Sequence, residues 1–216
     1  MAFQFFNPAK KVSVTHGHLP HWDQEGATYF ITWRTADSLP GEVWVRWRDE
    51  RGAWLAAHGI DPHSKDWRRQ VEELSDDERQ DYRRFAKVLE DELDTGHGEC
   101  VLRRPDIAEI VTGALRFFDG QRYELGDFVV MPNHVHLLAG GMAGNAMLKQ
   151  VESWKKWSAI KINEALGRSG RFWQDESFDH LVRSEASLVK FRRYIAENPV
   201  KARLRKGEFV WWRREG

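Results

Sequence analysis

The chain has 216 residues, of which 41% are hydrophobic and 11 are tryptophan, so it can bury a sizeable core and is not intrinsically disordered. Its single cysteine, Cys100, excludes an intramolecular disulfide, and no apolar N-terminal signal or apolar run of about 18 residues is present, which predicts a cytoplasmic protein without a membrane partner. Lys and Arg total 33, as do Asp and Glu; this zero net charge taken alone argues against a nucleic-acid-binding protein.

The even balance conceals an asymmetry along the chain. Residues 146–216 hold 16 Lys and Arg against 9 Asp and Glu, whereas residues 1–145 hold 17 against 24. The C-terminal third therefore carries a charge of +7 and is where a phosphate backbone would lie.

The first half of the chain contains one predicted strand and a long charged region. Residues 27–34 are rich in β-branched and aromatic side chains and predict the strand. From Gly41 to about Leu93 the pattern is helical and heavily charged, with a break at 61–64.

The second half predicts further helices and strands in alternation. A helix opens at 103–106, and residues 123–130 and 134–139 predict two strands joined tightly as an antiparallel pair. A helix over about 145–166 carries Trp154 and Trp157, which are three apart and favour core positions. A last strand is predicted within 173–182, a helix over 187–197, and an apolar tail from Gly207 that packs back or contacts DNA. The order β-α-β-β-α-β and then a helix predicts an α+β, ferredoxin-like fold.

The run Met131-Pro132-Asn133-His134-Val135-His136-Leu137-Leu138 has two imidazoles one residue apart in a predicted strand. Successive strand side chains alternate between faces, so His134 and His136 share one face. Two neutral imidazoles side by side are a half-site for a divalent metal. From the spacing alone, two hydrogen-bonded histidines on a half-exposed strand remain an equal alternative.

The segment Phe191-Arg192-Arg193-Tyr194-Ile195-Ala196-Glu197-Asn198-Pro199-Val200-Lys201-Ala202 supplies the context. Tyr194 and Asn198 are four residues apart and share a helical face, and Pro199 predicts the end of that helix. Together the two segments closely resemble the single-tyrosine HUH transposases, in particular the group associated with repetitive extragenic palindromes (REP). Further matches at 153–155, 170–174 and 178–180 extend the resemblance over most of residues 97–204, and it also touches the strand at 27–35.

The resemblance implies a fold and a domain organisation. The fold would be an RRM-like antiparallel sheet with helices on one side, the HUH strand in the sheet and the tyrosine helix near the C-terminus. Residues 1–216 would form a single domain, with a charged helical insertion at about 41–95 after the first strand and a basic tail at about 205–216.

The resemblance also assigns roles to individual residues. Tyr194 would be the nucleophile, His134 and His136 the metal ligands, and Asn198, where many relatives have glutamine, would complete the metal site. Mg²⁺ or Mn²⁺ fits this ligand set better than structural zinc, because two imidazoles, an amide and water leave room for phosphate oxygens. A phosphotyrosine would conserve the bond energy, so that a 3′-hydroxyl could later rejoin the strands.

Relatives act on single-stranded DNA beside imperfect palindromic hairpins, and the same partner class is implied for this chain, which would associate with the nucleoid while acting. The predicted DNA contacts are Arg192, Arg193, Lys155, Lys156, Lys161 and Lys201. Two alternatives stay open: a protein that binds structured nucleic acid without cutting it, and a metal-dependent hydrolase in which Tyr194 is structural. Family members include dimers, so monomer and homodimer both stay open.

Overall fold

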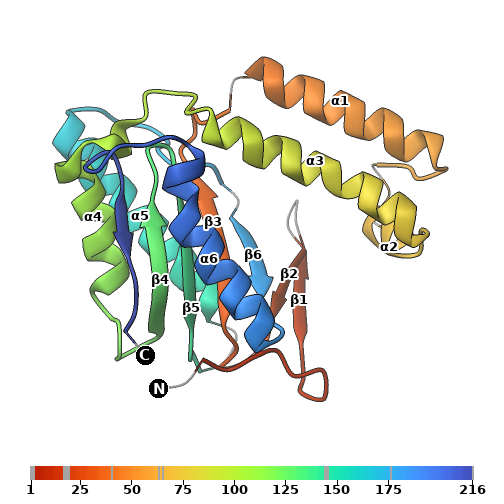
Figure 1. Ribbon diagram of the computed structural model, residues 1–216, viewed down its shortest axis with the longest axis horizontal. Coiled ribbons are helices and arrows are strands. Elements are labelled where there is room, and N and C mark those ends of the chain that lie inside the picture. Colours follow the sequence, from red (N-terminus) through yellow and green to blue (C-terminus); the bar gives the residue numbers. More distant parts are fainter. Residues whose placement is uncertain are drawn as a thin grey trace. The chain divides into compact units, whose positions relative to one another are not determined.

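The computed structural model describes residues 3–16, 20–39, 41–62, 64, 66–143, 146–175 and 177–215 (Figure 1). They divide into two compact units: Met1–Ser38 with Glu99–Gly216, and Leu39–Gly98. The helical insertion expected at about 41–95 falls within the second unit, while the single-domain description stays a prediction.

The first unit is built on a five-stranded sheet with the order β6-β3-β5-β4-β7. These strands are β6 (Phe178–Leu181), β3 (Tyr29–Arg34), β5 (His134–Gly140), β4 (Glu124–Val130) and β7 (Val210–Trp212). Every neighbouring pair is antiparallel, and the first four strands have the ferredoxin-like order. The α+β class and the antiparallel sheet are therefore confirmed.

Three helices of the first unit cover the two faces of the sheet (Figure 1). Helices α4 (Pro105–Arg116), preceded by the short 3₁₀ helix Val101–Arg103, and α5 (Met147–Leu166) pack on one face, where Ile31, Val135 and Leu137 are buried. Helix α6 (Glu185–Lys201) packs on the other face, against Phe30 and Leu138. The expectation of helices on one side thus holds for α4 and α5, whereas α6 covers the opposite face because Leu188 and Ile195 give it an apolar stripe of its own.

The register of the central strands determines which side chains meet beneath α6. His134 lies opposite Arg34, His136 opposite Thr32, and Leu138 opposite Phe30. On the other side of β3, Thr32 lies opposite Phe178 and Phe30 opposite His180. Since alternate residues share a face, these side chains form three cross-strand rows on the α6 face.

Helix α6 begins at a capping box in which the Ser184 and Ser187 side chains satisfy each other's backbone N–H groups. The expectation that the helix ends at Pro199 is wrong, because it continues to Lys201. Proline in the last turn removes only its own N–H, and the Ala202 N–H still donates to the Asn198 carbonyl at 3.0 Å.

Two further elements belong to the first unit. The hairpin β1 (Ser13–His16) and β2 (Pro20–Asp23) forms a separate two-stranded sheet that the sequence pattern did not indicate. The apolar tail packs back as β7, where the Trp212 ring stacks on Phe128 with centroids 5.4 Å apart.

The second unit consists of α1 (Gly41–Ala57), α2 (Trp67–Glu72) and α3 (Asp76–Asp94). Its own small core contains Trp54, Leu55, Ile60, Val71 and Phe85. Ion pairs such as Lys87–Asp91 lie on its exposed surface and contribute little to stability. Across the described parts of both units, none of the helices is long and apolar enough to span a membrane.

Candidate functional site

The two histidines of the HUH strand lie together beneath α6. His134 is 1% exposed and His136 is 3% exposed, and their ring centroids are 4.6 Å apart. The strand alternation that predicts a shared face is therefore confirmed, but both rings are fully buried rather than half-exposed.

Each imidazole is held through its Nδ1 atom. His134 Nδ1 lies 2.7 Å from the Asn133 side-chain oxygen, and His136 Nδ1 lies 2.7 Å from the Thr32 hydroxyl. An amide oxygen only accepts hydrogen bonds, so His134 Nδ1 carries the proton and His134 Nε2 keeps a lone pair. That Nε2 atom is buried and has no hydrogen-bond partner. Such outer contacts fix the tautomer and orientation of metal-binding histidines.

Asn198 reaches the same place from α6. It is 1% exposed; its Nδ2 donates to His136 Nε2 at 3.4 Å, and its Oδ1 is buried without a hydrogen-bond partner. A buried polar atom without a partner costs free energy unless something else satisfies it. Two imidazole Nε2 atoms and an amide oxygen in one buried cluster fit a divalent cation that keeps water or substrate oxygens as its other ligands. Among the described residues, no three or more His, Cys, Asp or Glu side chains are grouped so that they could hold a metal ion by themselves.

Burial keeps both histidines neutral. Desolvation, with the nearby Arg34 charge, lowers the pKa of His134 to about 3, against a smaller opposing effect of the neighbouring Asn198 side chain. Desolvation also lowers the pKa of His136 well below its ordinary value, and the electrostatic effects of His134 and Arg34 lower it further. Neutral imidazole is the form that binds metals, so at neutral pH no proton has to be displaced first.

Tyr194 stands beside this cluster on α6, one helical turn before Asn198. Its half-buried ring lies edge-on to His136, with centroids 5.1 Å apart, and edge-on to Phe30 at 5.7 Å. Lys201 Nζ lies 5.3 Å from the Tyr194 ring centroid and 3.4 Å from the Glu197 carboxylate. The structure thus brings together four residues, His134, His136, Tyr194 and Asn198, which form the candidate site.

Two of the predicted DNA contacts are wholly or partly buried and are hydrogen-bonded within the protein. Lys155 is 5% exposed, and its ammonium donates to the Asp175 carbonyl at 2.6 Å and to Glu152 at 3.1 Å. Arg192 donates to both carboxylate oxygens of Asp127, at 3.0 and 2.8 Å. Contact of either residue with DNA would require these bonds to break, and it stays a prediction.

The other predicted DNA contacts are exposed but divide between the two faces of the sheet. Arg193 and Lys201 lie on α6 near Tyr194, whereas Lys156 and Lys161 lie on α5, across the sheet from the histidines. On α5, Trp154 is buried as expected, but the prediction that Trp157 is a core residue is wrong, since it is 48% exposed.

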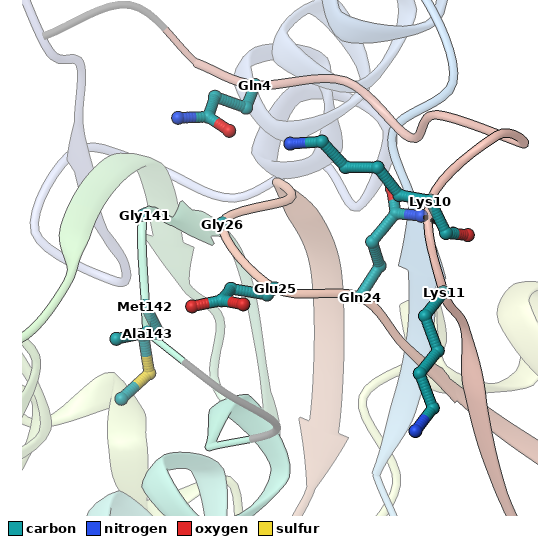
Figure 2. Close-up of a pocket in the computed structure, with 9 residues that line it drawn as sticks. All are labelled: Gln4, Lys10, Lys11, Gln24, Glu25, Gly26, Gly141, Met142 and Ala143. Carbon is teal, nitrogen blue, oxygen red and sulfur yellow. Dashed lines mark hydrogen bonds between the residues drawn. The ribbon is translucent and has the colours of Figure 1, made fainter.

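A separate hollow of about 500 Å³ lies at the other end of the sheet, where β3 begins and β5 ends (Figure 2). Figure 2 shows Lys10 extending toward Gln4, whereas Lys11 points away from it. None of the nine residues drawn belongs to the candidate site, so this hollow is not part of it.

Sequence reasoning missed Thr32, Asn133 and Arg34. Asn133 adjoins His134 in the sequence and could have been found there, because an amide next to a metal-binding histidine is a natural acceptor for Nδ1. Thr32 and Arg34 come from a strand about 100 residues away, and only the β3–β5 register shows which histidine each one meets.

The family model described as "Transposase IS200 like" matches residues 100–198, which include all of the candidate site. The resemblance to this transposase family is thereby confirmed over that segment, and it supports a transposase-type role in DNA processing.

The solved structures similar to the chain include the following two. The REP-associated tyrosine transposase bound to a REP hairpin is 15% identical, with 84% of this chain and 71% of that chain covered and a TM-score of 0.47. A protein described as a transposase from Deinococcus radiodurans R1 is 18% identical, with 79% and 89% covered and a TM-score of 0.30. Because both TM-scores are low, neither likeness bears on the function of this chain. No curated protein matches the sequence.

Proposed function

We propose that the protein is a metal-dependent endonuclease and strand transferase that acts on single-stranded DNA at REP-like hairpins through a 5′-phosphotyrosine. One observation carries the proposal: the Tyr194 ring packs against His136, whose Nε2 faces the same buried cluster as the unpartnered His134 Nε2 and Asn198 Oδ1. If Tyr194 served only to pack the core, nothing would explain why buried nitrogen and oxygen atoms without hydrogen-bond partners lie beside it.

In the proposed step, the Tyr194 phenolic oxygen attacks the scissile phosphorus and the bond from phosphorus to the 3′ oxygen breaks. The phenol gives up its proton and the released 3′ oxygen gains one, so a free 3′-hydroxyl and a 5′-phosphotyrosine result. The ammonium of Lys201 above the Tyr194 ring favours the charged phenolate electrostatically. Attack by a 3′-hydroxyl on the phosphotyrosine reverses the step and joins strands.

His134, His136 and Asn198 would hold a Mg²⁺ or Mn²⁺ ion through the two Nε2 atoms and the amide oxygen. When bound, the ion supplies positive charge where the phosphate oxygens gain negative charge. The protein's own contribution is to keep both imidazoles neutral and oriented, through Asn133 and Thr32.

The test is formation of a covalent protein–DNA adduct. The protein is mixed with a single-stranded hairpin oligonucleotide and Mn²⁺ and is then resolved on a denaturing gel. Tyr194→Phe should abolish the adduct and leave binding nearly unchanged, since it removes one oxygen without altering shape or charge. Tyr82→Phe in the second unit is the matched control and should form the adduct normally.

Adduct at the wild-type level in Tyr194→Phe would overturn the assignment of the nucleophile. Binding without any adduct in the wild type would favour a nucleic-acid-binding protein. Cleavage without adduct would favour a metal-dependent hydrolase.

A further inference from the structure

A continuous series of aromatic rings leads from the candidate site to the edge of the sheet. The His136 and Phe30 rings stack with centroids 5.6 Å apart, Phe30 and Phe191 stack at 4.4 Å, and Phe191 and His180 stack at 6.3 Å. The interplanar angles of these three pairs are 16°, 8° and 24°, so each ring is nearly parallel to the next. His180, the outermost ring, belongs to an exposed residue on the edge strand β6.

Phe178 occupies the neighbouring position on the same face of β6. Its ring lies edge-on to His180, with centroids 4.5 Å apart, and it is directly opposite Thr32, which holds His136. From His136 on β5 to Phe178 on β6 is two strand spacings, roughly 10 Å. The half-buried ring of Phe178 and the exposed ring of His180 therefore lie about two strand spacings from the histidines of the candidate site.

Positive charge accompanies these rings. Arg183 and Lys190 are exposed, and both interact electrostatically with His180. Desolvation is the largest cause that lowers the pKa of His180, and the two cations lower it further, against the opposing effect of Asp179. His180 therefore presents a neutral aromatic ring at neutral pH, with two cations close to it.

We propose that Phe178 and His180 form a subsite for an unpaired nucleobase next to the scissile phosphate, with Arg183 and Lys190 neutralising the flanking phosphates. An exposed aromatic ring beside cations is complementary to a nucleotide, which offers an apolar base and an anionic backbone. The subsite rests on the proposed function because it takes the strand that Tyr194 would cut. It is sequence-tolerant, since every base can stack.

The experiment measures binding in the absence of chemistry. Tyr194→Phe protein is titrated, without metal, into a fluorescent DNA hairpin that carries a single-stranded thymidine tail. A second hairpin carries a tail of the same length made of abasic nucleotides, which keeps the phosphates and removes the bases. The ratio of the two affinities reports base stacking alone.

Stacking is worth about 1–3 kcal/mol per base, so His180→Ala should weaken binding of the thymidine tail by about fivefold to 150-fold. Binding of the abasic tail should change little. His180→Phe, which keeps a ring, should restore the preference for the thymidine tail. Phe117→Ala is the matched control, since Phe117 is 71% exposed at the end of α4, and it should leave both affinities unchanged.

Equal loss for both tails in His180→Ala, or no rescue by His180→Phe, would overturn the subsite. So would a wild-type protein that does not prefer thymidine to abasic tails. These outcomes are independent of adduct formation, so a failed cleavage assay and a failed subsite are distinguishable.

Discussion

The ion pair between Asp127 and Arg192 gives a quantitative prediction about the tyrosine helix. The Asp127 side chain is 2% exposed and that of Arg192 is 27% exposed. Asp127 lies at a bulge in β4. The neighbouring residue, Gly126, packs so closely against β5 that a Cβ added to it would lie 2.7 Å from Leu138 Cβ. The Asp127 carboxylate also accepts the Arg214 backbone N–H at 3.1 Å, so it ties α6 and the C-terminal segment to the sheet.

The difference in exposure predicts that Arg192→Ala and Asp127→Ala lower the free energy of unfolding by different amounts. Arg192→Ala leaves a buried carboxylate with one backbone donor, and removal of one partner of a buried pair costs about 3–5 kcal/mol. Asp127→Ala leaves a guanidinium that can turn toward water. The free energy of unfolding should therefore fall only by about the contribution of the lost hydrogen bonds, about 1–3 kcal/mol. Arg192→Ala should therefore be the more destabilising change by about 2 kcal/mol.

Urea unfolding, monitored by tryptophan fluorescence, measures the change in the free energy of unfolding for both variants. Arg193→Ala is the matched control, because Arg193 is the adjacent residue and is exposed, and it should cost at most about 0.5 kcal/mol. Equal losses for Arg192→Ala and Asp127→Ala, or a loss in Arg192→Ala no larger than in the control, would refute the reasoning. Arg192 would then be available for the DNA contact that the sequence predicts.

Two further predictions concern the histidines. The unfolded chain takes up protons at the ordinary imidazole pKa of 6.5, whereas folded His134 does so only near 3 and His136 is shifted the same way. The free energy of unfolding of the metal-free protein should therefore fall as pH decreases below about 6.5, by up to about 1.4 kcal/mol per pH unit for each histidine. Urea titrations over a pH series should show a shallower fall in His136→Gln; an identical pH dependence would contradict the prediction. Separately, His134→Ala and His136→Ala should each lose Mg²⁺- or Mn²⁺-dependent adduct formation, and Asn198→Ala should lose less because an amide oxygen contributes a weaker dipole. A wild-type rate in either histidine variant throughout a metal titration would show that the ion does not bind there.

The parts of the site that follow a backbone period could be predicted from the sequence. Alternation on a strand placed His134 and His136 on one face, and the four-residue helical spacing placed Tyr194 with Asn198. The ferredoxin-like arrangement of four strands followed from the predicted order β-α-β-β-α-β, because each of these elements shows its own period, whereas the fifth strand β7 was not predicted.

The parts that depend on packing between distant segments could not be predicted. Lys155 looks exposed in a charged helix, yet its carbon chain is buried and its ammonium reaches the Asp175 carbonyl, 20 residues later. Arg192 likewise looks like a surface cation until the bulge in β4 turns Asp127 toward it. Neither partner is visible as a local pattern, because each contact requires the fold to be known first.

Phe30 joins the two predicted halves of the site. The histidine pair and the tyrosine–asparagine pair come from segments about 60 residues apart. Strand and helix geometry sets the spacing within each pair, but not the distance between the two pairs. Phe30, from a third segment, is 5% exposed and contacts His136, Tyr194 and Phe191. Its ring fills the space between strand and helix and so sets the distance between the proposed nucleophile and the proposed metal ligands. The strand at Tyr29–Arg34, which carries little of the sequence resemblance, therefore contributes the spacer Phe30, the hydroxyl of Thr32 and the charge of Arg34 to one site.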